Sequence, residues 1–285
     1  MRVTMILLAL AGLCACDRNE RSGSDAPSIR PAPAAFAFDG ADATTREARL
    51  KHGERLAWIL GCKGCHGSNM QGGNVTKDDP GFGDMNAPNV TLKMAEYSDA
   101  ELDQLLRHGK PKDGREFWFM PVESYQFLAD ADVAALTAYL RTLKPEGKQL
   151  PPIRIGEGLK QQSAAGILVS SAGMLKRYRE QAPPDLGERH AYGRQLSRIV
   201  CAECHNSSLQ GFEGFTPDLD IAGAYSATEL ETLLTTGKGK TKADLGLMSE
   251  SARHRFARMT PHERSAVIAY VKARAERPGE KPTKP

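Results

Sequence analysis

Aromatic residues are scarce in this sequence: phenylalanine, tryptophan and tyrosine together make up 6% of its 285 positions. Small cores would therefore need another bulky apolar group to fill them. The sequence also has no strong excess of positive or negative charge, because the formal net charge is only +3. It contains no long lysine or arginine tract either, and both observations argue against nucleic-acid binding. Strand-like alternation of apolar and polar residues is absent as well. What remains, with 40% hydrophobic and 26% charged residues, predicts a globular all-α protein that faces water.

Long hydrophobic runs are limited to one at the amino end. Arg2 precedes an apolar run over residues 3–13, which is far shorter than the ~20 residues that a transmembrane helix needs. This pattern predicts an export signal. The letters LCAC at 13–16 resemble a bacterial lipobox with Cys16 as the lipidated first residue of the mature chain, and Asp17 resembles an inner-membrane retention signal. The alternative is an ordinary secretory signal that leaves a soluble periplasmic protein.

Cysteine is limited to six positions, and none is left over for a structural disulfide. Two lie at the amino end, and the other four belong to two CxxCH motifs: Cys62, Cys65 and His66 in the first, Cys201, Cys204 and His205 in the second. A thioredoxin-like dithiol would need a βαβ context, which the sequence lacks. A zinc site made from both pairs would join cysteines across 135 intervening residues, far more than in zinc ribbons.

Covalent haem explains the histidine that follows each cysteine pair. Two thiols separated by two residues can each add to one vinyl group of a porphyrin, and the next residue is then held beneath the iron as its proximal ligand. In bacteria this attachment takes place outside the cytoplasm, which agrees with the export signal. The sequence therefore predicts two covalently bound haem c groups, with His66 and His205 as iron ligands.

An internal repeat accompanies the two motifs. YSDAELDQLLRHGK begins at Tyr97 and YSATELETLLTTGK begins at Tyr225, an offset of 128. Each copy predicts a short helix with a serine–glutamate capping box at its start, three leucines on one face and a glycine at its end. Helical patterns also precede each CxxCH motif and close each copy, at 129–143 and 260–274. The sequence thus predicts two small helical domains in tandem.

The second ligand of each iron decides between electron transfer and chemistry, because a filled position prevents the binding of gas or peroxide. Met120 and Met248 share the offset of 128, and both follow the capped helix in loop-like sequence, so we expect them to be these ligands. Met259 lies near Met248 and competes with it as a candidate. The other histidines do not recur at matched positions and are interpreted as surface or packing residues: His52, His108, His190, His254 and His262.

These features resemble the class I cytochrome c superfamily, through CKGCH, CAECH, the methionine loops and the closing AYL and AYV segments. The resemblance implies that a proline carbonyl accepts a hydrogen bond from each proximal histidine, and Pro88 and Pro217 match that position. The first domain is similar to the haem domains of membrane-bound alcohol dehydrogenase cytochrome subunits. The chain departs from those subunits because it has no third CxxCH motif, and Ser249 stands where proline would follow the second methionine.

The predicted organisation has six parts: an export signal over 1–16, a flexible tether over 17–45, a cytochrome c domain over 46–145, a connector over 146–186, a second cytochrome c domain over 187–277 and a tail over 278–285. The composition of the connector assigns it no role.

The expected function is electron transport between respiratory-chain partners by a periplasmic, lipid-anchored di-haem cytochrome that is not itself an enzyme. A quinol-oxidising complex or a periplasmic dehydrogenase would be the donor, and a terminal oxidase or reductase the acceptor. The alternatives are a di-haem oxidoreductase of the peroxidase or sulfur-compound dehydrogenase type, and a haem sensor. Each alternative requires one open iron.

Overall fold

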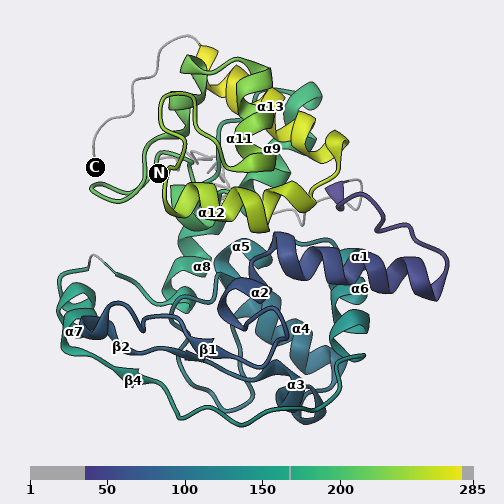
Figure 1. The fold of residues 1–285 in the computed structure, drawn as a ribbon, viewed down its shortest axis with the longest axis vertical. Helices are drawn as coiled ribbons and strands as arrows, with labels where there is room; N and C mark the ends of the chain where they lie inside the picture. The colour runs from purple at the N-terminus through teal and green to yellow at the C-terminus, as the bar shows by residue number, and fades with distance from the viewer. Residues whose placement is uncertain (1–35, 167, 278–285) are drawn as a thin grey trace, which may run out of the picture. The chain divides into compact units, whose positions relative to one another are not determined.

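The computed structural model describes residues 36–166 and 168–277. The predictions for the export signal, for Cys16, for most of the tether and for the tail fall outside this part of the chain. Within it the chain is mostly helical, and the prediction of an all-α protein is confirmed (Figure 1). None of the helices in these ranges is both long and apolar enough to cross a membrane.

The first domain surrounds the first CxxCH motif with helices, short 3₁₀ helices and two-residue strands. In chain order its elements are α1 (Arg46–Ile59), α2 (Cys62–Cys65), β1 (Gly73–Asn74), η2 (Pro80–Phe82), β2 (Gly83–Asp84), β3 (Asn86–Ala87), α3 (Val90–Lys93), η3 (Met94–Glu96), α4 (Asp99–His108), α5 (Val122–Tyr125) and α6 (Asp130–Leu140). β1 pairs antiparallel with β3, with Gly73 opposite Ala87. Strands of two residues cannot form a sheet layer, so they stiffen one loop of a helical domain.

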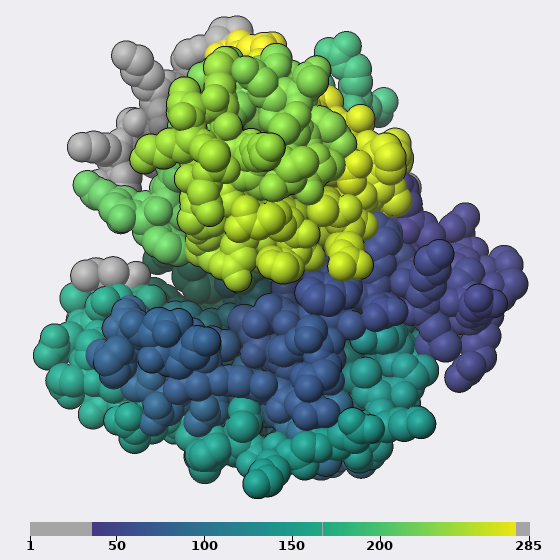
Figure 2. All heavy atoms as spheres, in the orientation of Figure 1, coloured from purple at the N-terminus to yellow at the C-terminus, as the bar shows by residue number. Residues whose placement is uncertain are grey.

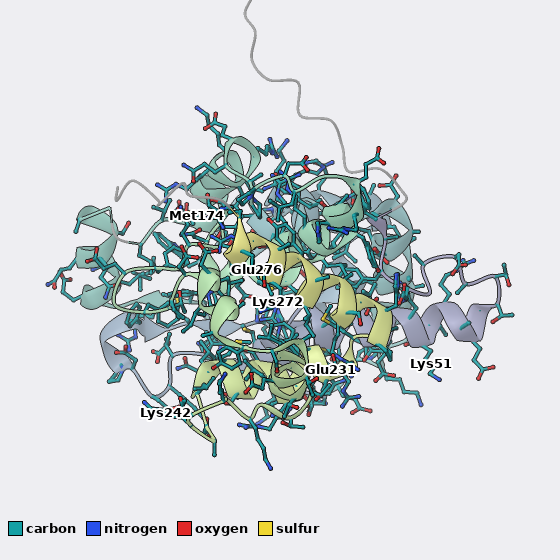
Figure 3. All side chains as sticks on the ribbon, turned by 90° about the horizontal axis from the view of Figure 1, so that it is seen from above. Lys51, Met174, Glu231, Lys242, Lys272 and Glu276 are labelled. Atoms are coloured by element: carbon teal, nitrogen blue, oxygen red, sulfur yellow. The ribbon has the colours of Figure 1, made fainter. Side chains whose placement is uncertain are left out.

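The second domain repeats the helical plan. Its elements are α9 (Glu188–Val200), α10 (Ala202–His205), η4 (Leu219–Ala224), α11 (Ala227–Thr236), α12 (Leu247–His254), η5 (Phe256–Arg258) and α13 (Pro261–Glu276). The outer side of α13 is polar: Lys272 and Glu276 pair one turn apart at 3.4 Å (Figure 3). Glu231 of α11 also reaches α13, where it pairs with Arg264 at 2.7 Å. Charged pairs thus cover the solvent side of these helices.

The ends of the repeated helix follow the local sequence as predicted. Ser98 and Glu101 form a complete capping box at the start of α4, and Ser226 and Glu229 form one at the start of α11. Both helices end at a glycine in the left-handed conformation, with φ of 61° and 78°. The predicted capped helix is therefore confirmed in both domains.

The first and last helices of each domain cross at a glycine. A Cβ on Gly53 of α1 would lie only 2.0 Å from the carbonyl oxygen of Ala135 in α6. Gly193 of α9 has the same relation to Ala266 of α13, again at 2.0 Å. The two backbones are thus in direct contact, which only glycine permits. Because the CxxCH motif follows the first helix directly, this crossing sets the position of the haem-attachment segment.

The connector is an ordered part of the fold that contacts both domains. Its elements are β4 (Arg154–Ile155), α7 (Glu157–Ala164) and α8 (Ser171–Glu180). β4 pairs with β2 of the first domain, and Arg154 forms an ion pair with Asp84 at 2.8 Å. α8 packs against α5, and its Tyr178 hydroxyl donates to the carbonyl of Ala202 in the second domain at 2.9 Å.

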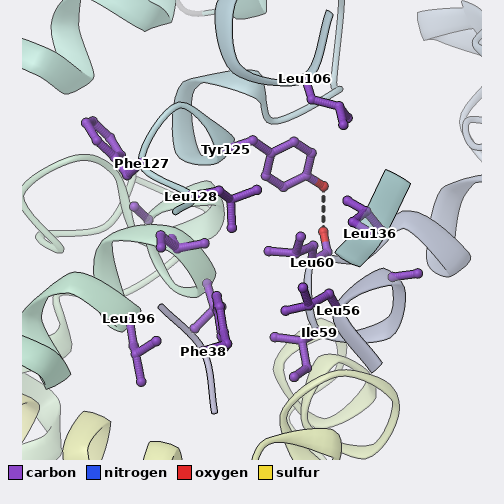
Figure 4. Packing of buried hydrophobic residues seen from close by; sticks show 14 of the residues in the cluster. Phe38, Leu56, Ile59, Leu60, Leu106, Tyr125, Phe127, Leu128, Leu136 and Leu196 are labelled. Carbon is purple, nitrogen blue, oxygen red and sulfur yellow. Dashed lines mark hydrogen bonds between the residues drawn. The ribbon is translucent and has the colours of Figure 1, made fainter. Parts of the chain in front are cut away.

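The end of the predicted tether is folded, which corrects its boundary. Residues 36–45 belong to the described part of the chain. Phe38 is 1% exposed and lies in one hydrophobic cluster with Leu56 of α1 and Leu196 of α9 (Figure 4). Its N–H donates to the buried carboxylate of Asp132 at 3.0 Å. The neighbouring Asp39 N–H also donates to Glu263 at 2.9 Å, so the buried ring and these hydrogen bonds hold a segment whose composition predicted flexibility.

Buried apolar residues of both domains belong to this single cluster, and both domains fall within one compact unit of the chain. In Figure 2 the side chains of the first domain, coloured purple to teal, contact those of the second, coloured green to yellow. The two domains therefore share an interface.

Candidate functional site

The first CxxCH motif forms one helical turn, α2, directly after α1. Gly61 separates the two helices with φ of 80°, a left-handed conformation that glycine adopts readily. The N–H of His66 donates to the carbonyl of Cys62 at 2.9 Å, which closes the turn. His66 Nδ1 lies 2.8 Å from the carbonyl oxygen of Pro88. Since a carbonyl can only accept, Nδ1 holds the proton and Nε2 keeps the lone pair that a metal requires.

The second motif has the same geometry. The N–H of His205 donates to the carbonyl of Cys201 at 2.9 Å, and His205 Nδ1 lies 2.8 Å from the carbonyl oxygen of Pro217. Burial lowers the pKa of His66 and of His205, although the bond to the proline carbonyl opposes this shift in each case. Both rings are thereby biased toward the neutral form that binds metals.

Two glycines let the proline loops approach the histidines. Gly72, with φ of +86°, would place a Cβ 2.5 Å from the carbonyl oxygen of Ala87. Gly211, with φ of +81°, would place one 2.2 Å from the carbonyl oxygen of Thr216. Sequence reasoning missed both residues. Their shared position, six residues after the motif histidine in each copy, was a signal that could have identified them.

The thiols do not form a reactive pair. All four cysteines of the motifs are free, and burial raises the pKa of Cys62 to about 11 and that of Cys201 to about 12. Redox-active dithiols require the opposite shift, because the thiolate is the nucleophile. Among the described residues, no group of three His, Cys, Asp or Glu side chains could hold a metal ion. The raised pKa values of the thiols argue against the dithiol interpretation.

An apolar cavity lies beside the first motif. Cys62, Cys65, His66 and Pro88 are among its lining residues. The repeated helix α4 and its neighbours provide apolar walls: Leu102, Leu105, Leu106, Phe117, Tyr125 and Leu136. Two thiols, an imidazole with a free Nε2 and an apolar enclosure fit a porphyrin that is attached through the cysteines and ligated by His66.

Met120 lines the same cavity as His66. The residue before it, Phe119, has φ of 63°, a left-handed conformation that is uncommon for residues other than glycine and that persists only where the surroundings impose it. Three further methionines also line this cavity: Met70, Met85 and Met94. The fold thus brings Met120 to the site of His66, together with three other methionines.

Met248 lies in the first turn of α12, so the expectation of a loop at this position is wrong. Its neighbour Ser249 explains the helix start, because the buried Ser249 hydroxyl accepts from the N–H of Leu245 at 2.7 Å and donates to the carbonyl of Gly237. Met248 is half-buried against the core, and Met259 is buried at 4% exposure. Both remain candidates for the second iron.

Two of the other histidines pair with aspartates outside this cavity. His52 is buried, and its Nε2 lies 2.8 Å from Asp132. His262 is exposed, with Nδ1 3.0 Å from Asp39. Neither residue is part of the cavity lining.

Two tyrosines that sequence reasoning missed hold the attachment segments. The hydroxyl of Tyr125 donates to the carbonyl of Leu60, just before the first motif, at 2.6 Å (Figure 4). The hydroxyl of Tyr178 donates to the carbonyl of Ala202, inside the second motif, at 2.9 Å. Tyr178 belongs to the connector, so comparison of the two repeats could not have found it.

Glu123 of α5 is buried, and one of its carboxylate oxygens has no hydrogen-bond partner. Burial raises the pKa of this carboxyl to about 8, and the charge of Glu203 adds to the effect. In the unfolded chain the carboxyl loses its proton near pH 4.5, so the folded state binds more protons between these two values. We therefore expect the free energy of unfolding to fall as pH rises through this interval, by at most about 1.4 kcal/mol per pH unit.

Glu123→Gln should flatten this pH dependence, because glutamine does not titrate. Denaturant unfolding near pH 5 and near pH 8 measures the slope in the two proteins. Glu250→Gln is the matched control, since Glu250 is exposed on α12. The same slope in all three proteins would contradict the burial argument.

Comparison with known proteins agrees with this geometry. The sequence model of the family described as Cytochrome c matches residues 50–144 and 190–275. The two matches cover more than half of the chain, and each contains one CxxCH motif.

Three curated relatives share this likeness. The chain is 24% identical over 265 residues to the fructose dehydrogenase cytochrome subunit of Gluconobacter japonicus, which covers 81% of this chain and 54% of that protein. It is 30% identical over 169 residues to a diheme cytochrome c-type protein of Cereibacter sphaeroides, covering 54% and 55%. It is 24% identical over 271 residues to the gluconate 2-dehydrogenase cytochrome c subunit of Pantoea cypripedii, covering 82% and 61%.

The chain spans less than two thirds of the length of each of these relatives. In this chain the haem-attachment domain occurs twice, with both cysteines, the proximal histidine and the proline carbonyl in place in each copy. The chain belongs to the cytochrome c family and is a c-type cytochrome with two covalently bound haem groups.

Proposed function

We propose that this protein carries electrons between redox partners in the periplasm, with each iron closed by a histidine and a methionine. The observation that supports this most strongly is the duplicated proximal site. In both domains the histidine Nδ1 lies 2.8 Å from a proline carbonyl, so both imidazoles have the same orientation and the same free nitrogen. Two equivalent sites suit successive transfer of single electrons better than a division into one catalytic and one storage site.

Haem iron supplies one-electron exchange between its ferric and ferrous states. The protein orients His66 and His205 through the proline carbonyls, and the apolar wall around the first site keeps water away. Met120 and Met248 would fill the remaining iron position in their domains, which favours the ferrous state and a high potential. With both positions filled, little rearranges when an electron arrives.

The relatives that are named as dehydrogenase cytochrome subunits favour a periplasmic dehydrogenase as the electron donor, with a quinol-oxidising complex as the other candidate. A terminal oxidase or reductase would be the acceptor. Lipidation of Cys16 would anchor the chain to the inner membrane. The residues between Cys16 and the folded segment at 36–45 would form the tether.

Optical spectra of the oxidised, reduced, and reduced carbon monoxide-treated protein test the proposal. They are recorded on membrane and soluble fractions of cells that export the full chain. We expect a c-type spectrum in the membrane fraction, a far-red methionine-to-ferric-iron band and no change with carbon monoxide. Cys16→Ser should move the same spectrum to the soluble fraction.

A carbon monoxide shift on half of the haem would mean one open iron. That result would replace the carrier by a di-haem oxidoreductase or a haem sensor. An unchanged distribution of Cys16→Ser between the fractions would exclude the lipid anchor.

A further inference from the structure

We propose that Arg255 is a positioning residue for electron transfer between the two haems, because it joins the two haem-attachment segments in a single contact. The inference rests on the proposed carrier function and specifies the internal route. It assigns a role to a residue outside both CxxCH motifs and outside the repeated helix.

The guanidinium of Arg255 bridges the two domains directly. Its Nε donates to the carbonyl of Ile59 at 3.0 Å, and its Nη1 donates to Glu203 at 2.8 Å. Ile59 is the last residue of α1, three positions before Cys62, and Glu203 lies inside the second motif. The side chain of Arg255 is only 13% exposed, so this contact is largely shielded from solvent. The Arg255 guanidinium and the Glu203 side chain therefore connect the end of α1 to the second motif.

A second observation shows that the two haem-attachment segments are close to each other. Glu203, from the second motif, is one of the residues that line the haem cavity of the first domain. Arg255 also packs closely on Gly61, directly before the first motif, since a Cβ there would lie 3.1 Å from Arg255 Cζ. The second attachment segment thus closes part of the first haem site.

The surrounding structure holds both segments in this arrangement. Tyr125 of α5 binds the carbonyl before the first motif, and Tyr178 of α8 binds a carbonyl inside the second. α5 and α8 pack against each other, so the two tyrosines brace the segments from neighbouring helices. Because electron transfer slows steeply with distance, a rigid contact at this point favours direct exchange between the haems.

Arg255 should also act on the potentials of both haems. A positive charge near an iron disfavours its oxidised form, and a largely buried charge is weakly screened. Arg255→Gln leaves the carboxylate of Glu203 uncompensated, so both potentials should fall. Arg255→Lys keeps the charge, but one ammonium cannot replace a planar guanidinium that donates in two directions.

The experiment uses the full-length holoprotein in three variants, with covalent haem content checked by mass spectrometry. Redox titration measures the two potentials, and flash reduction followed by absorbance measures the rate of exchange between the haems. We expect Arg255→Gln to lower both potentials and to slow the exchange. Arg255→Lys should slow the exchange with potentials close to those of the original protein. Arg253→Gln, at an exposed arginine in the last turn of α12, two positions before Arg255, should change neither quantity.

A potential shift at one haem only, or at neither, would overturn the proposal, because Arg255 would then not serve both sites. Exchange in Arg255→Lys at the original rate would also overturn it. A failure of the proposed carrier function would give a different result from a failure of the proposed role of Arg255. It would appear as carbon monoxide binding to the unsubstituted protein, whatever the potentials of the Arg255 variants.

Discussion

Replacing Met120 with alanine should open the haem of the first domain to carbon monoxide while leaving covalent attachment intact. Met120 lines the cavity that contains His66 and both cysteines, and its loss removes the sulfur that would close the iron. Attachment depends on Cys62 and Cys65, which the substitution does not touch. We expect a carbon monoxide shift on half of the haem, loss of half of the far-red band and a lower potential at one site.

Met85→Ala is the matched control, because Met85 lines the same cavity and is buried at 3% exposure. It should leave the iron closed and change only the packing. If Met85→Ala opens the iron and Met120→Ala does not, the ligand is Met85, and the argument from the shared offset fails. In the second domain, Met248→Ala and Met259→Ala make the corresponding comparison.

Replacing Gly53 or Gly193 with alanine should strongly destabilise the domain that contains it. The added methyl group would lie 2.0 Å from a backbone carbonyl oxygen of the facing helix, a distance that no side-chain rotation can relieve. Overpacking of this kind costs roughly 1–3 kcal/mol and sometimes more, and contact with backbone favours the upper end. Chemical denaturation of the holoprotein, followed by the haem absorbance and by helical circular dichroism, measures the loss.

Helix propensity predicts the opposite sign, since alanine in a helix is more favourable than glycine by about 1 kcal/mol. An unchanged or increased free energy of unfolding would therefore contradict the close crossing of the helices. Lys51→Ala on α1 is the control, because Lys51 is exposed on the same helix (Figure 3). It should leave the stability almost unchanged.

Features that depend on residues a few positions apart could be predicted. The capping box of Ser98 and Glu101, the glycine that ends the helix and the tandem domains all follow from short-range spacing. The CxxCH motif belongs to the same class, because two thiols and an imidazole within five positions determine their own chemistry. The sequence by itself thus determined the fold class, the cofactor and its attachment points.

Other features needed the tertiary structure. The folded segment at 36–45 is held by Phe38, which is buried in a cluster with residues of both domains, and by the contacts of Asp39 with Arg55 and Glu263. The helical setting of Met248 depends on the bond from Ser249 to Gly237, 12 positions away. Neither contact can be predicted from neighbouring residues, because the two residues that make it belong to different segments of the chain.

The contact between the two haem-attachment segments is the clearest case. Arg255 is separated from Ile59 by 196 positions and from Glu203 by 52, and nothing in the letters around Arg255 distinguishes it from the exposed Arg253. Chemistry within one turn of helix is set by covalent spacing, so the sequence alone determined that two haems are bound. How the two haem-attachment segments lie against each other depends on the packing of α5 against α8 and on the contacts of Arg255 with Ile59 and Glu203, and only the tertiary structure decided it.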